Sequence, residues 1–172
     1  MSDLSPIDHI KNEGLRKLLV YWLDLRNGAS VPKRSQLDPI AIPWALAEIW
    51  LMQLDHDVGR FRFRLAGESV QTIFEQNLSG KTHQDLLDEE VAGIVEGKLT
   101  RVCSEPAICH EVGPIYTNTN RPGDGERLIM PLATDDGRNE FILGCTFYDW
   151  FGYVEPAGGP SVGYTTTFYP IS

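Results

Sequence analysis

Two regions with the hydrophobic pattern of a β-hairpin, separated by a region with helical spacing, constrain the fold of this chain most. The first joins an apolar run at 49–54 to a strictly alternating segment, Phe-Arg-Phe-Arg-Leu, at 61–65. The second joins apolar segments at 127–133 and 141–148 through an Asp-Gly turn. Alternation with period two is typical of a strand with one buried face, and an Asp-Gly turn favours a tight hairpin.

Apolar residues at helical spacing precede the first hairpin and separate it from the second. We predict helices at 7–26, 68–74 and 88–104, followed by a strand at 106–112. Because strands and helices do not alternate along the chain, this order excludes a doubly wound parallel sheet. It predicts an α+β fold, in which an antiparallel sheet carries helices on one face.

Length and charge limit the classes of function. A chain of 172 residues is typical of one domain. The formal net charge of −9 argues against nucleic acid as a partner, because a protein that neutralises phosphates needs a basic face. No run approaches the roughly 20 apolar residues of a membrane span, and acidic residues interrupt the first twenty positions, unlike a signal peptide. We therefore expect a cytoplasmic protein with no membrane partner.

The residues that bind metals or act as nucleophiles form no recognisable motif. The three cysteines and four histidines are widely spaced, which predicts neither a disulfide framework nor a metal site. We expect the cysteines to be small, partly buried apolar residues. Cys109 and His110 are neighbours on a predicted strand, so their side chains point to opposite faces and do not form a catalytic pair. The sequence therefore predicts no catalytic residues.

Several segments, taken in order, resemble a PAS domain, and in particular an alphaproteobacterial subfamily of stand-alone or N-terminal sensory domains (PAS_5-like). The resemblance covers about 15–147. The segments that carry it are Leu19-Val20-Tyr21-Trp22 with the Pro32 linker, 38–54, Phe61-Arg62-Phe63-Arg64-Leu65-Ala66-Gly67 with Asn77-Leu78-Ser79-Gly80-Lys81, and Glu126-Arg127-Leu128-Ile129-Met130-Pro131-Leu132 with Ile142-Leu143-Gly144.

The resemblance implies a five-stranded antiparallel sheet whose middle helices enclose a small apolar cavity. It also divides the chain into an N-terminal flanking helix and linker at 1–34, a PAS core at 35–150 and a tail at 151–172, which we expect to be extended or disordered. The loop at 113–125 is longer than in a compact version of the fold. The tail falls outside the resemblance.

No cofactor is assigned by the resemblance. Haem-binding PAS domains commonly use a histidine on the long helix before the third strand, and the helix predicted at 88–104 has none. Flavin-binding light sensors place a reactive cysteine where this chain has Asn-Leu-Ser-Gly at 77–80. The cofactor is therefore left unknown, with non-covalent flavin neither supported nor excluded.

A ligand cavity would be lined by alternate residues of the strands and by helix residues above them. On this reasoning, the candidate ligand-binding residues are Phe63, Phe74, Ile94, His110, Met130, Leu143 and Cys145. His110, and Arg127 with it, would supply polar contacts within an apolar wall, as in most small-molecule sites. The alternative is that these side chains fill a solid core, because sequence carries no information on volume.

The resemblance predicts a sensory or regulatory domain rather than an enzyme. It would bind a small molecule or a protein partner and signal in trans, since no effector segment accompanies it in this sequence. Tyr21 and Trp22 beside a leucine stripe also predict a homodimer through the N-terminal helix. The alternatives are a small enzyme that uses the same cavity and a structural dimer with a filled core.

Overall fold

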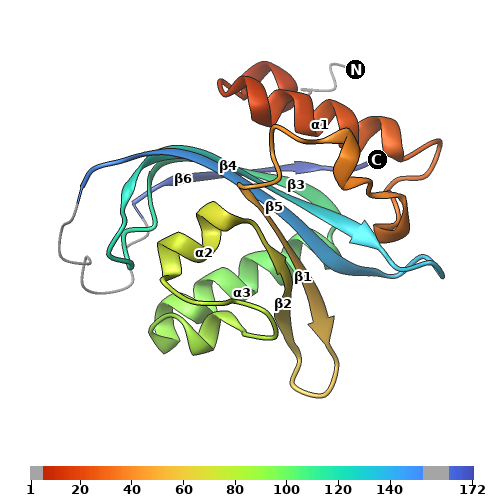
Figure 1. Cartoon of the computed structure of the whole chain (residues 1–172). Coiled ribbons are helices and arrows are strands. Elements are labelled where there is room, and N and C mark those ends of the chain that lie inside the picture. Colours follow the sequence, from red (N-terminus) through yellow and green to blue (C-terminus); the bar gives the residue numbers. More distant parts are fainter. Residues whose placement is uncertain (1–5, 153–162) are drawn as a thin grey trace.

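A six-stranded antiparallel sheet, with the strand order β2-β1-β5-β4-β3-β6, forms the centre of the molecule (Figure 1). The computed structural model describes residues 6–152 and 163–172. The strands are β1 (Ile49–Asp55), β2 (Arg60–Ala66), β3 (Ala107–Ile115), β4 (Gly123–Ala133), β5 (Asn139–Trp150) and β6 (Thr165–Pro170). Both predicted hairpins are present, as β1–β2 and β4–β5, and they lie side by side because β1 also pairs with β5.

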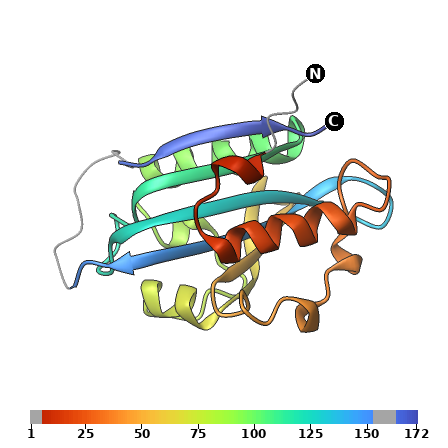
Figure 2. The same cartoon turned by 90° about the horizontal axis from the view of Figure 1, so that it is seen from above.

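Helices cover both faces of this sheet. The short helix α2 (Glu68–Phe74) and the longer α3 (Glu89–Ser104) lie on one face, and α1 (Glu13–Leu25) lies on the other (Figures 1 and 2). The predicted α+β fold with an N-terminal flanking helix is therefore confirmed. The helix expected at 7–26 is divided into a 3-10 turn, Pro6–His9, and α1. None of the described helices is long and apolar enough to cross a membrane.

The sheet has one strand more than the five predicted. The tail at 151–172 contains β6, which pairs with β3 along its outer side. A run of Thr, Phe and Tyr favours a strand. Its pairing also satisfies backbone N–H and C=O groups that an edge strand would leave open. Residues 153–162 of the expected tail lie outside the described residues.

The helix α1 closes one hydrophobic core against its face of the sheet. The Asn12 side chain accepts a hydrogen bond of 3.0 Å from the N–H of Leu15 and so caps the first turn. The fully buried residues of α1 recur at helical spacing: Leu15, Leu18, Leu19 and Trp22. The indole N–H of Trp22 donates a 3.0 Å hydrogen bond to the carbonyl of Pro131 in β4, which fixes α1 on the sheet.

A bulge in the first hairpin decides which residues of β2 face α2 and α3. Leu51 pairs with Leu65, but the next residue, Met52, pairs with Phe63, so β2 has one extra residue. Phe61 and Phe63 belong to the core beneath α2 and α3, whereas Leu65 is 45% exposed. The prediction that Phe61, Phe63 and Leu65 share one face was therefore wrong for Leu65, because an inserted residue reverses the alternation.

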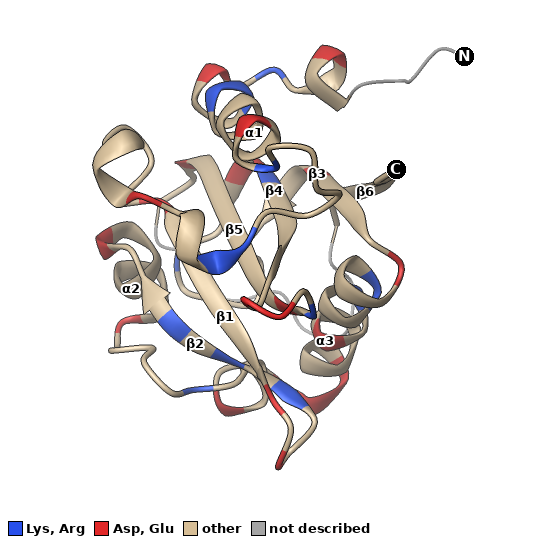
Figure 3. Ribbon diagram, turned by 90° about the vertical axis from the view of Figure 1, so that its right-hand side faces the viewer, with Lys and Arg blue, Asp and Glu red and all other residues tan. Residues whose placement is uncertain are grey.

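Charged side chains mark β2, which is one edge of the sheet (Figure 3). Arg62 forms an ion pair of 2.6 Å with Asp55 on β1, and the Arg64 guanidinium donates a 2.7 Å hydrogen bond to the amide oxygen of Gln53. Arg62 lies between the core-facing Phe61 and Phe63, as the alternating sequence predicts, and Arg64 follows them at the bulge. Charges along an edge strand oppose pairing with the edge of another molecule.

Candidate functional site

A cavity of about 80 Å³ lies between the sheet and the helices α2 and α3. Its apolar wall consists of Trp50, Phe63, Val70, Phe74, Leu87, Val91, Val95 and Ile129. Its polar wall consists of His83, Lys98, Tyr116, Thr117, Asn118, Thr119, Arg127 and Tyr164. A mostly apolar hollow with a few convergent polar groups is the usual form of a small-molecule site.

Two of the seven candidate residues from the sequence line this cavity. Phe63 enters it from β2 and Phe74 from the end of α2. Ile94 lies on α3 but is 41% exposed and is not part of the cavity wall. The helix therefore presents the next residue, Val95, to the cavity instead.

The other four candidates lie on the opposite face of the sheet. Met130, Leu143 and Cys145 belong to the core beneath α1, and His110 pairs with a carboxylate on that same side. Their placement in the cavity was therefore wrong by one residue in register, because neighbouring strand residues face opposite ways. Both faces of β4 and β5 are buried, so their apolar runs carried no alternation that would identify the cavity side.

A buried carboxylate, Glu111 on β3, organises the polar wall. Its Oε1 accepts a short hydrogen bond from Lys98 Nζ on α3, and its Oε2 accepts one of 3.0 Å from Arg127 Nη1 on β4. The Nε of Arg127 donates to the Thr146 hydroxyl at 2.8 Å, and Lys98 Nζ donates to the Tyr164 hydroxyl at 2.8 Å. Two cations and one carboxylate leave this cluster with one positive charge in excess.

Aromatic rings enclose the cationic side of the cavity. The Arg127 guanidinium carbon lies 4.9 Å from the Tyr116 ring centre, and Lys98 Nζ lies 4.6 Å from that of Tyr164. Tyr116 has a positive φ of 55°, which is costly for a residue with a side chain. The Thr119 hydroxyl donates a 2.7 Å hydrogen bond to the Tyr116 carbonyl and holds that turn. The segment expected to be a loop at 113–125 is therefore shorter than predicted, because β3 runs to Ile115 and β4 begins at Gly123. The turn at 116–122 between these strands brings the Tyr116 ring to the cavity.

His83 is a buried polar residue in the cavity wall, and its Nδ1 has no hydrogen-bond partner among the described residues. Burial, together with the nearby charges of Arg127 and Lys98, lowers the pKa of His83 to about 3. The imidazole is therefore neutral at pH 7. Its Nδ1 is buried and makes no hydrogen bond within the described part of the chain, while its ring packs against Phe63 with the ring centres 5.3 Å apart.

Sequence patterns contained a signal for the residues that the predictions missed. Lys98 lies on the same side of α3 as Val91, Val95 and Val102. That side of the helix is apolar and faces the sheet, so a lysine there is unusual. Glu111 follows Cys109 by two on β3 and so shares its buried face. A charge at a core position needs a buried partner. The aromatic side chains of the loop and tail left no such signal.

The three cysteines are free and are buried more deeply than the sequence predicted. Burial raises the pKa of Cys103 and of Cys109 to about 12, so both thiols are protonated at pH 7. Cys109 lies in the core beneath α2 and α3, whereas His110 faces α1. The two residues therefore do not pair, as the strand geometry predicted. Within residues 6–152 and 163–172, no three metal-binding side chains are grouped closely enough to hold an ion.

A second buried polar cluster ties α1 to the sheet. The Glu126 carboxylate accepts hydrogen bonds from the backbone N–H groups of Lys11 (3.0 Å) and Asn12 (2.6 Å). It also bonds to Nε2 of His110 at 2.6 Å. Glu126 and His110 directly precede Arg127 and Glu111 in the chain. The strands β3 and β4 therefore hold Glu111 and Arg127 on the cavity face of the sheet, and hold the start of α1 on the other face.

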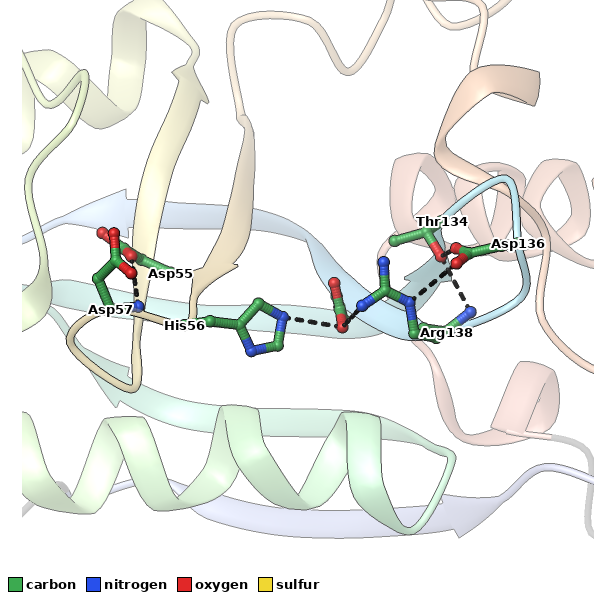
Figure 4. Close-up of polar contacts among 7 residues, drawn as sticks. Asp55, His56, Asp57, Thr134, Asp136 and Arg138 are labelled. Atoms are coloured by element: carbon green, nitrogen blue, oxygen red, sulfur yellow. Dashed lines mark hydrogen bonds and ion pairs between the residues drawn. The ribbon is translucent and has the colours of Figure 1, made fainter.

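A third polar cluster joins the turns of the two hairpins (Figure 4). One Glu140 oxygen contacts both His56 Nε2 and Arg138 Nη1, each at 2.9 Å. Arg138 also pairs with Asp136 at 3.1 Å. None of these residues lines the cavity, and most are exposed. This cluster therefore joins the hairpin ends at a place separate from the cavity.

Comparison with known families gives one match. The PAS_5 family model, described as a PAS domain, matches residues 10–147. No curated protein and no solved structure matches the chain. The matched range ends within β5, so β6 and the cavity residue Tyr164 lie beyond it.

Proposed function

Because the chain belongs to the PAS domain family, we propose that it is a non-catalytic sensory and regulatory domain that binds a small molecule between its sheet and α3. The family supports the sensory and regulatory role. One observation supports ligand binding. The cavity combines an apolar wall with polar groups, among them His83, whose Nδ1 finds no hydrogen bond in the described part of the chain. A solid core would not contain such a group without a partner, because burying it is costly.

The strands β3 and β4 offer a route by which occupancy of the cavity reaches α1. Glu111 and Arg127 are part of the cavity cluster, and their chain neighbours His110 and Glu126 contact the start of α1. A ligand that binds one arrangement of these strands more tightly than another would shift the position of α1. The signal would then leave the domain through the helix on the far side of the sheet.

The output of the domain is proposed to pass to a protein partner in trans, or across a homodimer formed through α1. The exposed side of this region carries Val20, which is 44% exposed, and Trp44, which is 38% exposed. Lys17 on α1 lies over the Trp44 ring, with Nζ 5.9 Å from its centre. Apolar side chains on the outward side of a helix suit contact with another protein surface. Light scattering of the purified protein measures whether it is a dimer.

The proposed ligand binding is tested by filling the cavity. Val95→Phe places a larger side chain in the cavity, whereas Ile94→Phe adds the same ring on the exposed side of the same helix turn. Ligand-observed NMR screens a panel of acids, amides, amines and alcohols with up to eight non-hydrogen atoms. We expect at least one class to bind to the unmodified chain and to Ile94→Phe, and not to Val95→Phe.

Two results would overturn the proposal. One is that no class of compound binds to the unmodified chain. The other is that Val95→Phe, still folded by circular dichroism, binds the same compounds as Ile94→Phe. Native mass spectrometry and an absorption spectrum of the freshly purified protein add an independent measurement, because extra mass or colour identifies a co-purified ligand.

A further inference from the structure

We propose that the cavity takes a short-chain monocarboxylate, an inference that deepens the ligand-binding function proposed above and rests on it. Charge is the first argument. Lys98 and Arg127 line the cavity, and no acidic residue is among the described residues of its wall. Glu111 lies behind them, fully buried, and neutralises one of the two cations. One positive charge is therefore left for a ligand with one negative charge.

Unused hydrogen-bonding groups are the second argument. A guanidinium has five N–H groups, and Thr146, Glu111 and Tyr116 occupy three of those of Arg127, which leaves two for a ligand. The buried Nδ1 of His83 has no partner within the described residues. A carboxylate accepts several hydrogen bonds at once, and planar recognition by arginine suits it. An uncharged ligand would leave the excess charge in this partly apolar site without compensation.

Size and the apolar wall are the third argument. One water needs about 10–15 Å³ of cavity by this measure, so about 80 Å³ holds roughly six atoms of that size. Trp50 lies over Gly144 of β5, where any side chain would collide with its indole ring, and forms the floor of the apolar side. A carboxylate with a tail of three carbons fits both walls. An inorganic anion would leave the apolar wall unoccupied.

The test compares ligands of equal size and different charge. Sodium butyrate, butyramide, butylamine and sodium phosphate are titrated into the full chain by calorimetry at pH 7. We expect butyrate to bind at least ten-fold more tightly than butyramide, and butylamine and phosphate to give no binding. Equal affinity for butyrate and butyramide would overturn the inference, as would binding of phosphate alone.

Two variants shift the charge of the cluster in opposite directions. Lys98→Met leaves the Glu111–Arg127 pair neutral and should weaken butyrate binding at least ten-fold. Glu111→Gln raises the excess to two positive charges and should tighten butyrate binding. Arg101→Met is the matched control, because Arg101 lies on the same helix but stacks over Phe168 outside the cavity. Its affinity for butyrate should not change.

The outcomes separate this inference from the proposed function. Binding of butyramide as tight as that of butyrate, or any binding of butylamine, that Val95→Phe abolishes would leave the ligand-binding function standing and overturn the carboxylate. Absence of binding by every compound would overturn both. If Lys98→Met fails to fold, Glu111→Gln still decides, because unchanged or weaker butyrate binding in that variant contradicts the charge argument.

Discussion

Glu111, Lys98, Arg127 and His83, called here the cavity cluster, affect both the stability of the fold and the suitability of the cavity for a ligand. Glu111 is fully buried, and a buried carboxylate is tolerated because Lys98 and Arg127 both bond to it. The same pairing keeps two cations at the wall of a cavity that has a large apolar surface. His83 adds a neutral group whose protonation both cations oppose. The residues that make this cavity suitable for a ligand are therefore also a source of instability when the pH changes.

His83 should make the stability of the domain dependent on pH. In the folded chain its pKa is lowered to about 3, whereas an unfolded chain has the ordinary value near 6.5. Between these values the unfolded chain binds one more proton, so the free energy of unfolding falls as the pH falls, by about 1 kcal/mol per pH unit. The groups that face His83 are Arg127 from β4 and Lys98 from α3, with Glu111 from β3 bonded to both.

Urea unfolding at pH 7, 6 and 5 measures this dependence. His83→Gln removes the titration, so its stability should fall less steeply with decreasing pH than that of the unmodified chain. If the free energy of unfolding of His83→Gln falls with pH as steeply as that of the unmodified chain, the pKa of His83 is not lowered in the folded state, which would contradict the prediction.

At the level of helices and strands, hydrophobic periodicity predicted most of the elements. The hairpins and the long helix α3 appear close to their expected positions, because each has the spacing of its own secondary structure. The faces of β4 and β5 were not predictable in this way, since Met130 and Ile129 are equally apolar and buried on opposite sides. A bulge in β2 also has no reliable sequence signal, and it turned Leu65 away from Phe63.

The strand β6 should protect the edge of β3. Its register places Thr166 opposite Glu111 and Thr167 opposite His110. The strand therefore runs beside one residue of the cavity cluster and one residue of the cluster that holds the start of α1. A chain that ends after Gly152 keeps the strands of the family match and loses β6 together with Tyr164. We expect this shortened chain to fold, and to self-associate because the backbone groups of β3 are unpaired.

Circular dichroism and light scattering measure the two parts of this prediction. The shortened chain should have a strand signal and an apparent mass that rises with concentration more steeply than that of the full chain. Tyr164→Phe in the full chain is the control, because it removes only the hydroxyl that contacts Lys98 and leaves β6 in place. A shortened chain with the same mass as the full chain at every concentration would contradict protection by β6.

In the whole molecule, the cavity is assembled from segments that are distant in the sequence. Trp50 comes from β1, Lys98 from α3, Tyr116 from the turn between β3 and β4, and Tyr164 from the segment before β6. The order of elements predicted the fold that brings the first two together. It did not predict the last two, because their positions depend on a loop and a tail that carry no periodic pattern. The chemistry of the site was therefore harder to foresee than the architecture that holds it.

The strands β3 and β4 should transmit binding in the cavity to α1. Glu126 accepts two backbone hydrogen bonds from the residues just before α1, and its neighbour Arg127 belongs to the cavity cluster. We expect butyrate to change hydrogen exchange of the first amides of α1, measured by mass spectrometry. Glu126→Gln removes the charge that holds this helix end, so we expect faster exchange there and a much smaller response to butyrate.

Binding itself must be measured in the same variant, because only retained affinity separates lost transmission from a lost site. Calorimetry should give Glu126→Gln the butyrate affinity of the unmodified chain, since Glu126 faces away from the cavity. Asp124→Asn, an exposed position on the same strand, should keep both affinity and response. An unchanged response of α1 in Glu126→Gln would mean that the signal does not pass through this carboxylate. The contacts of α1 with β4 made by Trp22 would then be the next route to test.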